Sequence, residues 1–358
     1  MQAHQRVSLL LLSLTMGLAH AAPASYPEYR VTIVGPANSQ PTDMNQAGAV
    51  VGITRLGPDS YSSFVNYGRG PVNLGRLGGR SNVAVAINDK GQVLGNVTTT
   101  NGQLRGYVYD RGSFRQLNGV GGRPTSYVDI NNAGYILASS GPPPTAPAGN
   151  AVPYLRAPNG TYRAIGALPY PNPITQPEAL NNRNQVTGES GTFILPEIPF
   201  YAFVWTNGVM RQLGDFGYTP NYGLDINDRG QVAGYTSTAT FREALATVWT
   251  HGRPLLIDTR PASSYRFSSA DAINNHGHAV GSANQIGAFI WRGRRMESLN
   301  SLIDRRSGWN ITFPRAINDA GQIAANGFRN GVGYAVRLDL IRPHALGAPQ
   351  LDDAQVTQ

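Results

Sequence analysis

Cysteine is absent from the 358-residue chain, and lysine occurs once, as Lys90. The lack of cysteine excludes disulfides, catalytic thiols and cysteine-based zinc sites. Helical periodicity is missing over long stretches. The G-x-S-x-G, H-E-x-x-H, P-loop and dinucleotide-binding motifs do not occur in the sequence. We therefore expect an all-β protein that uses no cofactor. Beyond the N-terminal segment no run of residues is apolar enough to cross a membrane, so we also expect no membrane span.

The chain is rich in glycine, with 42 residues, and it contains an internal repeat. Seven copies of a short Asp/Ala-x-Asn-x-x-Gly motif follow one another at steps of 43 to 50 residues. A period of roughly 40–50 residues is typical of propeller blades, none of which can bury its apolar face alone. The first Asn residues of the copies are Asn45, Asn88, Asn131, Asn181, Asn227, Asn274 and Asn318.

Each copy predicts a tight β-hairpin. In the second copy, alternating apolar residues flank the turn from Asn88 to Gly91. This pattern suits a type I turn with Asn at its first position and Gly in the left-handed region, where a bulge forms. In the fourth copy Asn184 replaces the Gly, and Asn is the next most tolerant residue for that conformation.

The segment after each hairpin predicts two further strands, so each repeat supplies a four-stranded blade. The last copy stops after its third strand, at 333–340, and the segment Tyr29–Gly35 resembles a lone fourth strand. We predict a seven-bladed β-propeller over residues 26–341, closed by the N-terminal strand, which would remove the exposed sheet edges. A solenoid is the alternative.

The repeats resemble those of the HAF-repeat family of bacterial extracellular proteins. The resemblance rests on the IND-x-GQV-x-G motif, as in Ile226–Gly234, and on the AF-x-W strand, and it covers nearly the whole mature chain. The histidine that gives the family its name is replaced by Tyr201 and Gly287. Membership implies export and a repeat fold, and it implies no reaction or ligand.

The termini predict export and a tail. Residues 1–21 carry a charged start, an apolar run and a small-x-small site, which is the pattern of a signal peptide cleaved after Ala21. We expect a secreted or periplasmic monomer with a disordered tail over residues 342–358. The net charge of +8 favours an anionic partner, such as an acidic polysaccharide or an envelope component, over nucleic acid.

The longest connections predict where a partner binds. Insertions at Gly141–Pro153, Leu168–Glu178 and Glu189–Phe200 fall on one face of the third and fourth blades. Loops on a rigid scaffold often carry binding sites, although these loops could simply pack over the ring. The candidate ligand-binding residues are Arg80, Arg123, Tyr170, Phe193 and Phe200.

Other constellations favour simpler explanations. The Asp129–Gly134 segment has the wrong spacing for a calcium loop, and His276 and His278 lack a third zinc ligand, so we predict no metal site. The sequence thus predicts an exported, non-enzymatic module that binds an anionic or carbohydrate partner. The alternatives are a structural module and a glycan-cleaving hydrolase or lyase, which two close carboxylates near the axis would favour. Candidate carboxylates are Glu178, Glu189, Glu197 and Asp215.

Overall fold

The computed structural model describes residues 27–141, 150–192, 199–217, 219–237, 243–260 and 265–342. The proposed signal peptide lies outside these ranges, as does the C-terminal tail except for Arg342. The described residues form 28 β-strands, and their only helices are three single 3-10 turns, η1 (Val120–Gly122), η2 (Leu299–Ser301) and η3 (Arg305–Ser307). None of the helices in this part of the chain is long and apolar enough to cross a membrane. The all-β prediction is confirmed.

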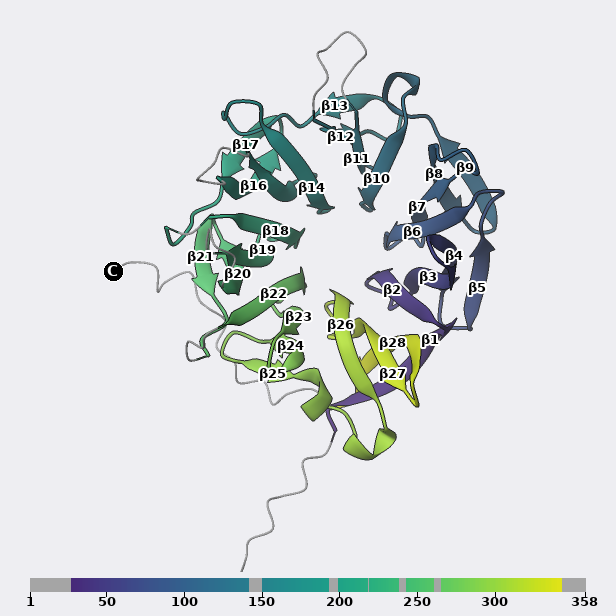
Figure 1. Ribbon diagram of the computed structural model, residues 1–358, viewed down its shortest axis with the longest axis vertical. Coiled ribbons are helices and arrows are strands. Elements are labelled where there is room, and N and C mark those ends of the chain that lie inside the picture. The colour runs from purple at the N-terminus through teal and green to yellow at the C-terminus, as the bar shows by residue number, and fades with distance from the viewer. Residues whose placement is uncertain are drawn as a thin grey trace, which may run out of the picture.

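The strands form sheets that radiate from a central axis (Figure 1). The first strand of each repeat lies nearest the axis and the second pairs with it. The first strands are β2 (Ser39–Met44), β6 (Ser81–Ile87), β10 (Thr125–Ile130), β14 (Ile174–Leu180), β18 (Asn221–Ile226), β22 (Arg266–Ile273) and β26 (Asn310–Ile317). The second strands are β3 (Val50–Gly57), β7 (Val93–Thr98), β11 (Ile136–Ser140), β15 (Val186–Gly191), β19 (Val232–Ser237), β23 (Ala279–Ala283) and β27 (Ile323–Arg329).

The third and fourth strands complete each sheet toward its outer edge. The third strands are β4 (Ser60–Asn66), β8 (Leu104–Asp110), β12 (Val152–Arg156), β16 (Phe200–Thr206), β20 (Glu243–Thr250), β24 (Gly287–Trp291) and β28 (Val332–Leu340). The outer strands are β5 (Pro71–Gly75), β9 (Ser113–Leu117), β13 (Tyr162–Ala164), β17 (Val209–Gln212), β21 (Arg253–Leu256), β25 (Met296–Ser298) and β1 (Tyr29–Ala37).

Hydrogen bonding groups the strands into five four-stranded sheets and one eight-stranded sheet. The larger sheet consists of β18–β21 and β22–β25, which are joined by a short parallel pairing of β20 with β22. In the sheet β1-β28-β27-β26, the first strand of the chain pairs antiparallel with the last, from Tyr29 opposite Leu340 to Ala37 opposite Tyr334. This is the pairing that the incomplete last copy predicts.

The hydrophobic core lies between neighbouring sheets. One cluster joins Leu94 and Val108 of the second repeat to Tyr127 and Ile136 of the third. Alternate residues of a strand point to opposite faces, so each sheet contributes to two such layers. This packing explains why a single repeat cannot fold alone.

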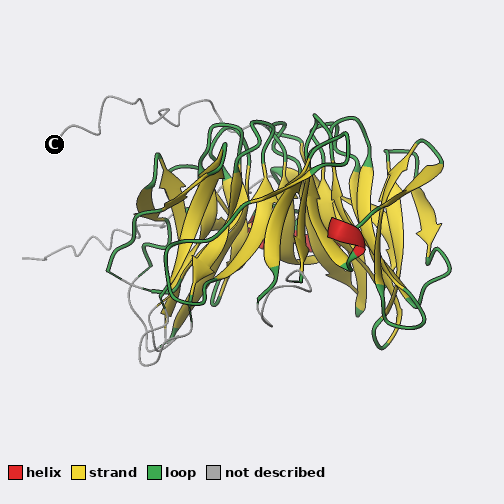
Figure 2. Cartoon of the chain, turned by 90° about the horizontal axis from the view of Figure 1, so that it is seen from above, coloured by secondary structure: helices red, strands yellow, loops and turns green. Residues whose placement is uncertain are grey.

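The motif turns have the predicted geometry. Gly91 has φ 78°, its N–H donates to the Asn88 carbonyl at 2.9 Å, and Asn88 N–H donates to Gln92 at 3.1 Å. Asn184 adopts φ 57° at the equivalent position, which confirms the prediction for the fourth copy. Seven such turns lie on one side of the molecule, which we call the turn face. The opposite side, with the loops between second and third strands and the connections between sheets, is the long-loop face. Figure 2 shows the strands running between two rims of loops.

The first Asn of each motif also links its turn to the next one. Its Nδ2 donates to the backbone carbonyl of the following motif's Asn at 2.8 to 3.1 Å in six cases, and at 3.4 Å from Asn318 to Asn45. All seven Asn residues are buried. A side-chain donor that turn chemistry alone does not require thus makes a lateral contact between consecutive repeats, and the Asn318 side chain makes the same contact with the first repeat.

A second row of hydrogen bonds runs beside the first. The backbone N–H of the residue after each Asn donates to the side-chain oxygen of the equivalent residue in the next motif, at 2.8 to 2.9 Å. The row therefore accepts Asp, Asn or Gln, all of which offer that oxygen. Its members are Gln46, Asp89, Asn132, Asn182, Asp228, Asn275 and Asp319.

Carboxylates in alternate repeats add a third kind of link. Asp43, Asp129 and Asp225 each accept a backbone N–H from the following first strand, at 2.8 Å. Burial raises the pKa of Asp129 to about 7, to which the negative charges of Asp43 and Asp225 contribute, while two backbone N–H donors act against the rise. Burial likewise raises the pKa of Asp43 and of Asp225 to about 6. Ala stands at this position in the other repeats, as Ala86, Ala179, Ala272 and Ala316.

We predict that Gly91→Val destabilises the fold by about 1–3 kcal/mol, because it forces a β-branched residue to positive φ. An added Cβ would also lie 3.2 Å from the Tyr67 ring. The measurement is chemical denaturation of residues 22–358. Asp89→Asn is the matched control and should cost less, because Asn keeps the oxygen that accepts from Gln46 N–H and loses only an exposed hydrogen bond with Asn132. Equal losses in the two variants would contradict the conformational explanation.

We also predict that the free energy of unfolding falls as the pH rises from 4 to 7. In this window the folded chain binds protons more readily than the unfolded chain, because Asp129 titrates near pH 7 when folded and near 3.8 otherwise. Asp129→Ala should flatten the slope by at most about 1.4 kcal/mol per pH unit. Asp59→Ala, which removes an exposed carboxyl, is the control. If the free energy of unfolding depended on pH equally in Asp129→Ala and in the wild type, the Asp129 carboxyl would not be the source of this pH dependence.

Candidate functional site

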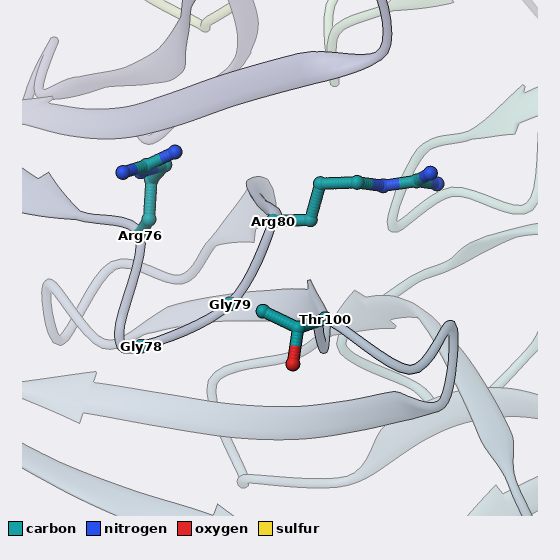
Figure 3. A pocket seen from close by; sticks show the side chains of 5 residues that line it. All are labelled: Arg76, Gly78, Gly79, Arg80 and Thr100. Carbon is teal, nitrogen blue, oxygen red and sulfur yellow. The ribbon is translucent and has the colours of Figure 1, made fainter.

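A basic hollow of about 420 Å³ opens on the long-loop face, where the connection from β5 to β6 meets the loop between β7 and β8. Its walls are Arg76, Gly78, Gly79, Arg80 and Thr100. Figure 3 shows the two Arg side chains leaving the connection in different directions, with Thr100 on the neighbouring loop. The hollow therefore presents two guanidinium groups and a hydroxyl at separate positions, so the two Arg side chains do not form one joint binding group.

Neither guanidinium of this hollow has a hydrogen-bond or ion-pair partner among the described residues. The loop itself is held by its backbone: Gly79 N–H donates to Arg76 at 2.9 Å and Arg80 N–H donates to Thr98 at 2.8 Å. Between them Leu77 adopts φ 51° and remains 40% exposed. A bulky residue at positive φ with an exposed apolar side chain is strained, and such strain often marks a functional loop.

Arg80 and Arg123, which both follow a Gly-Gly pair, have different environments. Arg123 is half-buried and donates from Nε to the Val120 carbonyl at 3.1 Å and from a terminal nitrogen to the Gly141 carbonyl. A third donor lies 3.5 Å from the Tyr154 hydroxyl. Arg123 is thus held against its own loop, whereas the donors of Arg80 are free to meet a partner.

The predicted aromatic ligands do not form one group. Tyr170 stacks on Tyr201, with ring centroids 5.8 Å apart. The expectation that Phe200 lies in a loop is wrong: Phe200 begins β16, pairs with Gly191 and is buried. Because neighbouring strand residues point to opposite faces, Tyr201 and Phe200 project to opposite sides of their sheet. Phe193 lies outside the described residues.

The insertions also contain more strand than their composition predicts. Leu168–Glu178 extends into β14, and Glu189–Phe200 includes the end of β15 and the start of β16. Pro177 is tolerated because a bulge follows it in the pairing of β14 with β15. Proline beside a bulge is therefore compatible with the first strand of a repeat. Amino-acid composition alone does not reveal where a bulge forms.

A smaller pocket of about 180 Å³ lies where β14, β15 and β16 meet the neighbouring first strand β18. Ile174, Gln176, Glu189, Phe200 and Tyr222 line it. It contains two residues that the sequence marked for other reasons, Glu189 as a candidate carboxylate and Phe200 as a candidate ligand. Tyr222 carried no sequence signal, because its role depends on contact between two sheets.

Exposed aromatic rings also occur on the long-loop face in residues that do not belong to the insertions. Phe267 at the start of β22, Phe313 near the start of β26 and Phe328 near the end of β27 are 43%, 53% and 42% exposed. Sequence reasoning missed them because alternation within a strand predicts rings in the core. Rings of this kind can stack on sugar faces or partner side chains.

Comparison with known proteins defines the fold class. No family model matches the chain, and no curated protein does either. The β-propeller domain of the Trilobed protease from Pyrococcus furiosus, which has an open velcro topology, matches with a TM-score of 0.58 at 11% identity. The match covers 84% of this chain and 93% of the other. YCF48, solved bound to D1 peptide, matches with a TM-score of 0.53 at 10% identity, over 89% of this chain and 99% of its own. The chain therefore has a β-propeller fold.

Proposed function

We propose that this β-propeller is an exported binding protein that recognises an anionic partner through the basic hollow on its long-loop face. The observation that carries the proposal is the pair of unpartnered guanidinium groups of Arg76 and Arg80 beside Thr100. Guanidinium groups bind carboxylates and phosphates through charge-assisted hydrogen bonds, and a hydroxyl adds a neutral donor. An acidic polysaccharide or envelope component has the required chemistry.

The net charge and the aromatic rings support the same class of partner. A net charge of +8 draws anionic molecules to the whole surface, and the hollow gives that attraction a place to act. Phe267, Phe313 and Phe328 offer apolar surface on the same face for sugar rings. An acidic glycan satisfies both features, because it combines carboxylates with stacking faces.

We further propose that the ring has seven blades and is closed by β1, and that the chain is related to the HAF-repeat proteins. The pairing of β1 with β28 and the hydrogen bond from Asn318 to Asn45 support closure. The short parallel pairing of β20 with β22 supports counting the eight-stranded sheet as two blades. Residues 1–21, with their signal-peptide pattern, support export to the periplasm or the medium.

The glycan-cleaving alternative depends on Glu178 and Glu189, whose charges interact. Hydrolysis needs both carboxyl groups to reach the glycosidic bond from opposite sides. Glu189 Oε2 is shut off from solvent, and its pocket is small. These features favour binding of a small chemical group over cleavage of a glycan chain. We therefore prefer the binding function.

We predict that the double variant Arg76→Ala, Arg80→Ala weakens binding of an oligomer of uronic acids roughly thirtyfold, at about 1 kcal/mol for each exposed guanidinium. The measurement is calorimetric titration at low and at physiological salt. Affinity of the wild type should fall with salt, because exposed charges are screened over about 8 Å at physiological ionic strength. Reducing ends should not accumulate during the titration.

The matched control is Arg69→Ala, Arg111→Ala. These residues belong to the same two sheets and carry the same charge, but they lie on the turn face. Their removal should lower affinity only slightly. Equal losses in the two double variants would reduce the effect to net charge. Release of reducing ends by the wild type would instead establish a glycan-cleaving hydrolase or lyase.

A further inference from the structure

The small pocket between the sheet β14–β17 and the strand β18 contains a buried carboxylate oxygen, which would not bind the proposed anionic partner. Glu189 Oε2 is buried there and has no hydrogen-bond partner among the described residues. A buried polar atom without a partner is costly, and native structures contain few of them. Since the Glu189 side chain lines the pocket, the missing partner of its carboxyl group is most simply a ligand.

The charges around this oxygen are of one sign. Burial raises the pKa of Glu178 to about 7, and burial together with the negative charge of Glu178 raises the pKa of Glu189 to about 8. No Arg or Lys of the described chain acts against either rise. Asp271 of β22 adds a further negative charge near Tyr235. Once Glu178 and Glu189 ionise, the pocket therefore carries a negative charge that no Arg or Lys of the described chain offsets at these two carboxyl groups.

Two of the residues that line the pocket are aromatic, Tyr222 and Phe200, and further rings adjoin Tyr222. Tyr222 stacks on Tyr235 of β19, with centroids 4.6 Å apart and ring planes 22° apart. Phe267 of β22 lies next to Tyr235, with centroids 6.4 Å apart. Phe200 closes the pocket from β16. Aromatic faces carry negative potential and attract cations, most strongly where water is excluded.

We propose that this pocket binds a protonated primary amine, whose ammonium group pairs with Glu189 and whose alkyl chain lies against Tyr222 and Phe200. The volume of about 180 Å³ corresponds to roughly six water molecules, so it suits a short alkyl ammonium rather than a sugar oligomer. A free amine, a lysine side chain and an amino sugar share this group. A metal ion is a poorer fit, because no cluster of three metal-ligating side chains occurs in the described part of the chain.

Proton linkage gives the proposal a specific signature. An ammonium ion requires an ionised Glu189, so binding below pH 8 must release a proton. Affinity should therefore rise by up to about tenfold per pH unit from pH 6 to 8, where an alkyl amine with a pKa of about 10.4 stays charged. Burial raises the pKa of Tyr222 and of Tyr235, so both facing phenols stay neutral in this range. A neutral ligand that accepts from protonated Glu189 would show the opposite trend.

The experiment titrates the full mature chain with butylammonium and, as the uncharged control, with butan-1-ol. Calorimetry at pH 6, 7 and 8, in two buffers with different ionisation enthalpies, measures affinity and proton release together. N-acetyl-lysine amide and glucosamine, each beside its N-acetylated form, identify the source of the amine. We expect butylammonium to bind at pH 8 with release of protons, and butan-1-ol to bind about tenfold more weakly or not at all.

Glu189→Gln keeps the shape of the side chain and removes its charge, so it should lose the preference for the amine and the release of protons. Tyr222→Phe keeps the ring and should bind normally, whereas Tyr222→Leu should bind more weakly. Asp215→Asn removes a charge from an exposed connection on the same face and serves as the control. Melting curves confirm that each variant is folded.

The outcome separates this site from the basic hollow. The Arg76→Ala, Arg80→Ala variant should bind butylammonium like the wild type, because its substitutions lie on other sheets. Equal affinity for butylammonium and butan-1-ol, or amine binding that survives in Glu189→Gln, would overturn the proposal. Affinity that falls between pH 6 and 8 would also overturn it, whatever the result for the acidic oligomer.

Discussion

The hydrogen bond from the side chain of one motif Asn to the backbone carbonyl of the next is the contact on which the arrangement of the sheets depends. Sheets that meet only through apolar side chains can slide or change their angle, because hydrophobic contacts are not directional. The Asn side chain is buried, short and fixed by its own turn, as at Asn227, whose Oδ1 accepts from Arg229 and Gln231. Its Nδ2 therefore sets the position of the next turn.

The two faces of the molecule follow from this constraint. On the turn face, each motif must keep its Asn and its positive-φ residue, so little variation is compatible with the contacts. Among the described residues of the long-loop face no equivalent contact recurs, and the connections differ in length and chemistry from sheet to sheet. A basic hollow beside β6 and an acidic aromatic pocket beside β14 can therefore coexist on one scaffold. Rigid positioning from one side and variable loops on the other are what a binding protein requires.

Local chemistry made part of this structure predictable. The Asn-x-x-Gly turns, the tolerance of Asn184 and the pairing of the N-terminal strand depend on short sequence patterns, and all three are observed. The roles of Arg123 and Phe200 were not predictable, because they depend on partners far away in the sequence. The lateral role of Asn did leave a signal: all seven copies keep Asn where a type I turn would also accept Asp or Ser.

The most direct test of the account is the stability of Asn227→Asp in chemical denaturation. Asp keeps the oxygen that accepts from Arg229 and Gln231, but it loses the donor that lies 2.8 Å from the Asn274 carbonyl. The account predicts a loss of about 2–3 kcal/mol, because a buried carboxylate oxygen would face a carbonyl. Asn159→Asp, which keeps an exposed turn oxygen that accepts from Thr161 N–H, should change little. If Asn227→Asp were as stable as the wild type, Asn would be only a turn residue and the central claim would be wrong.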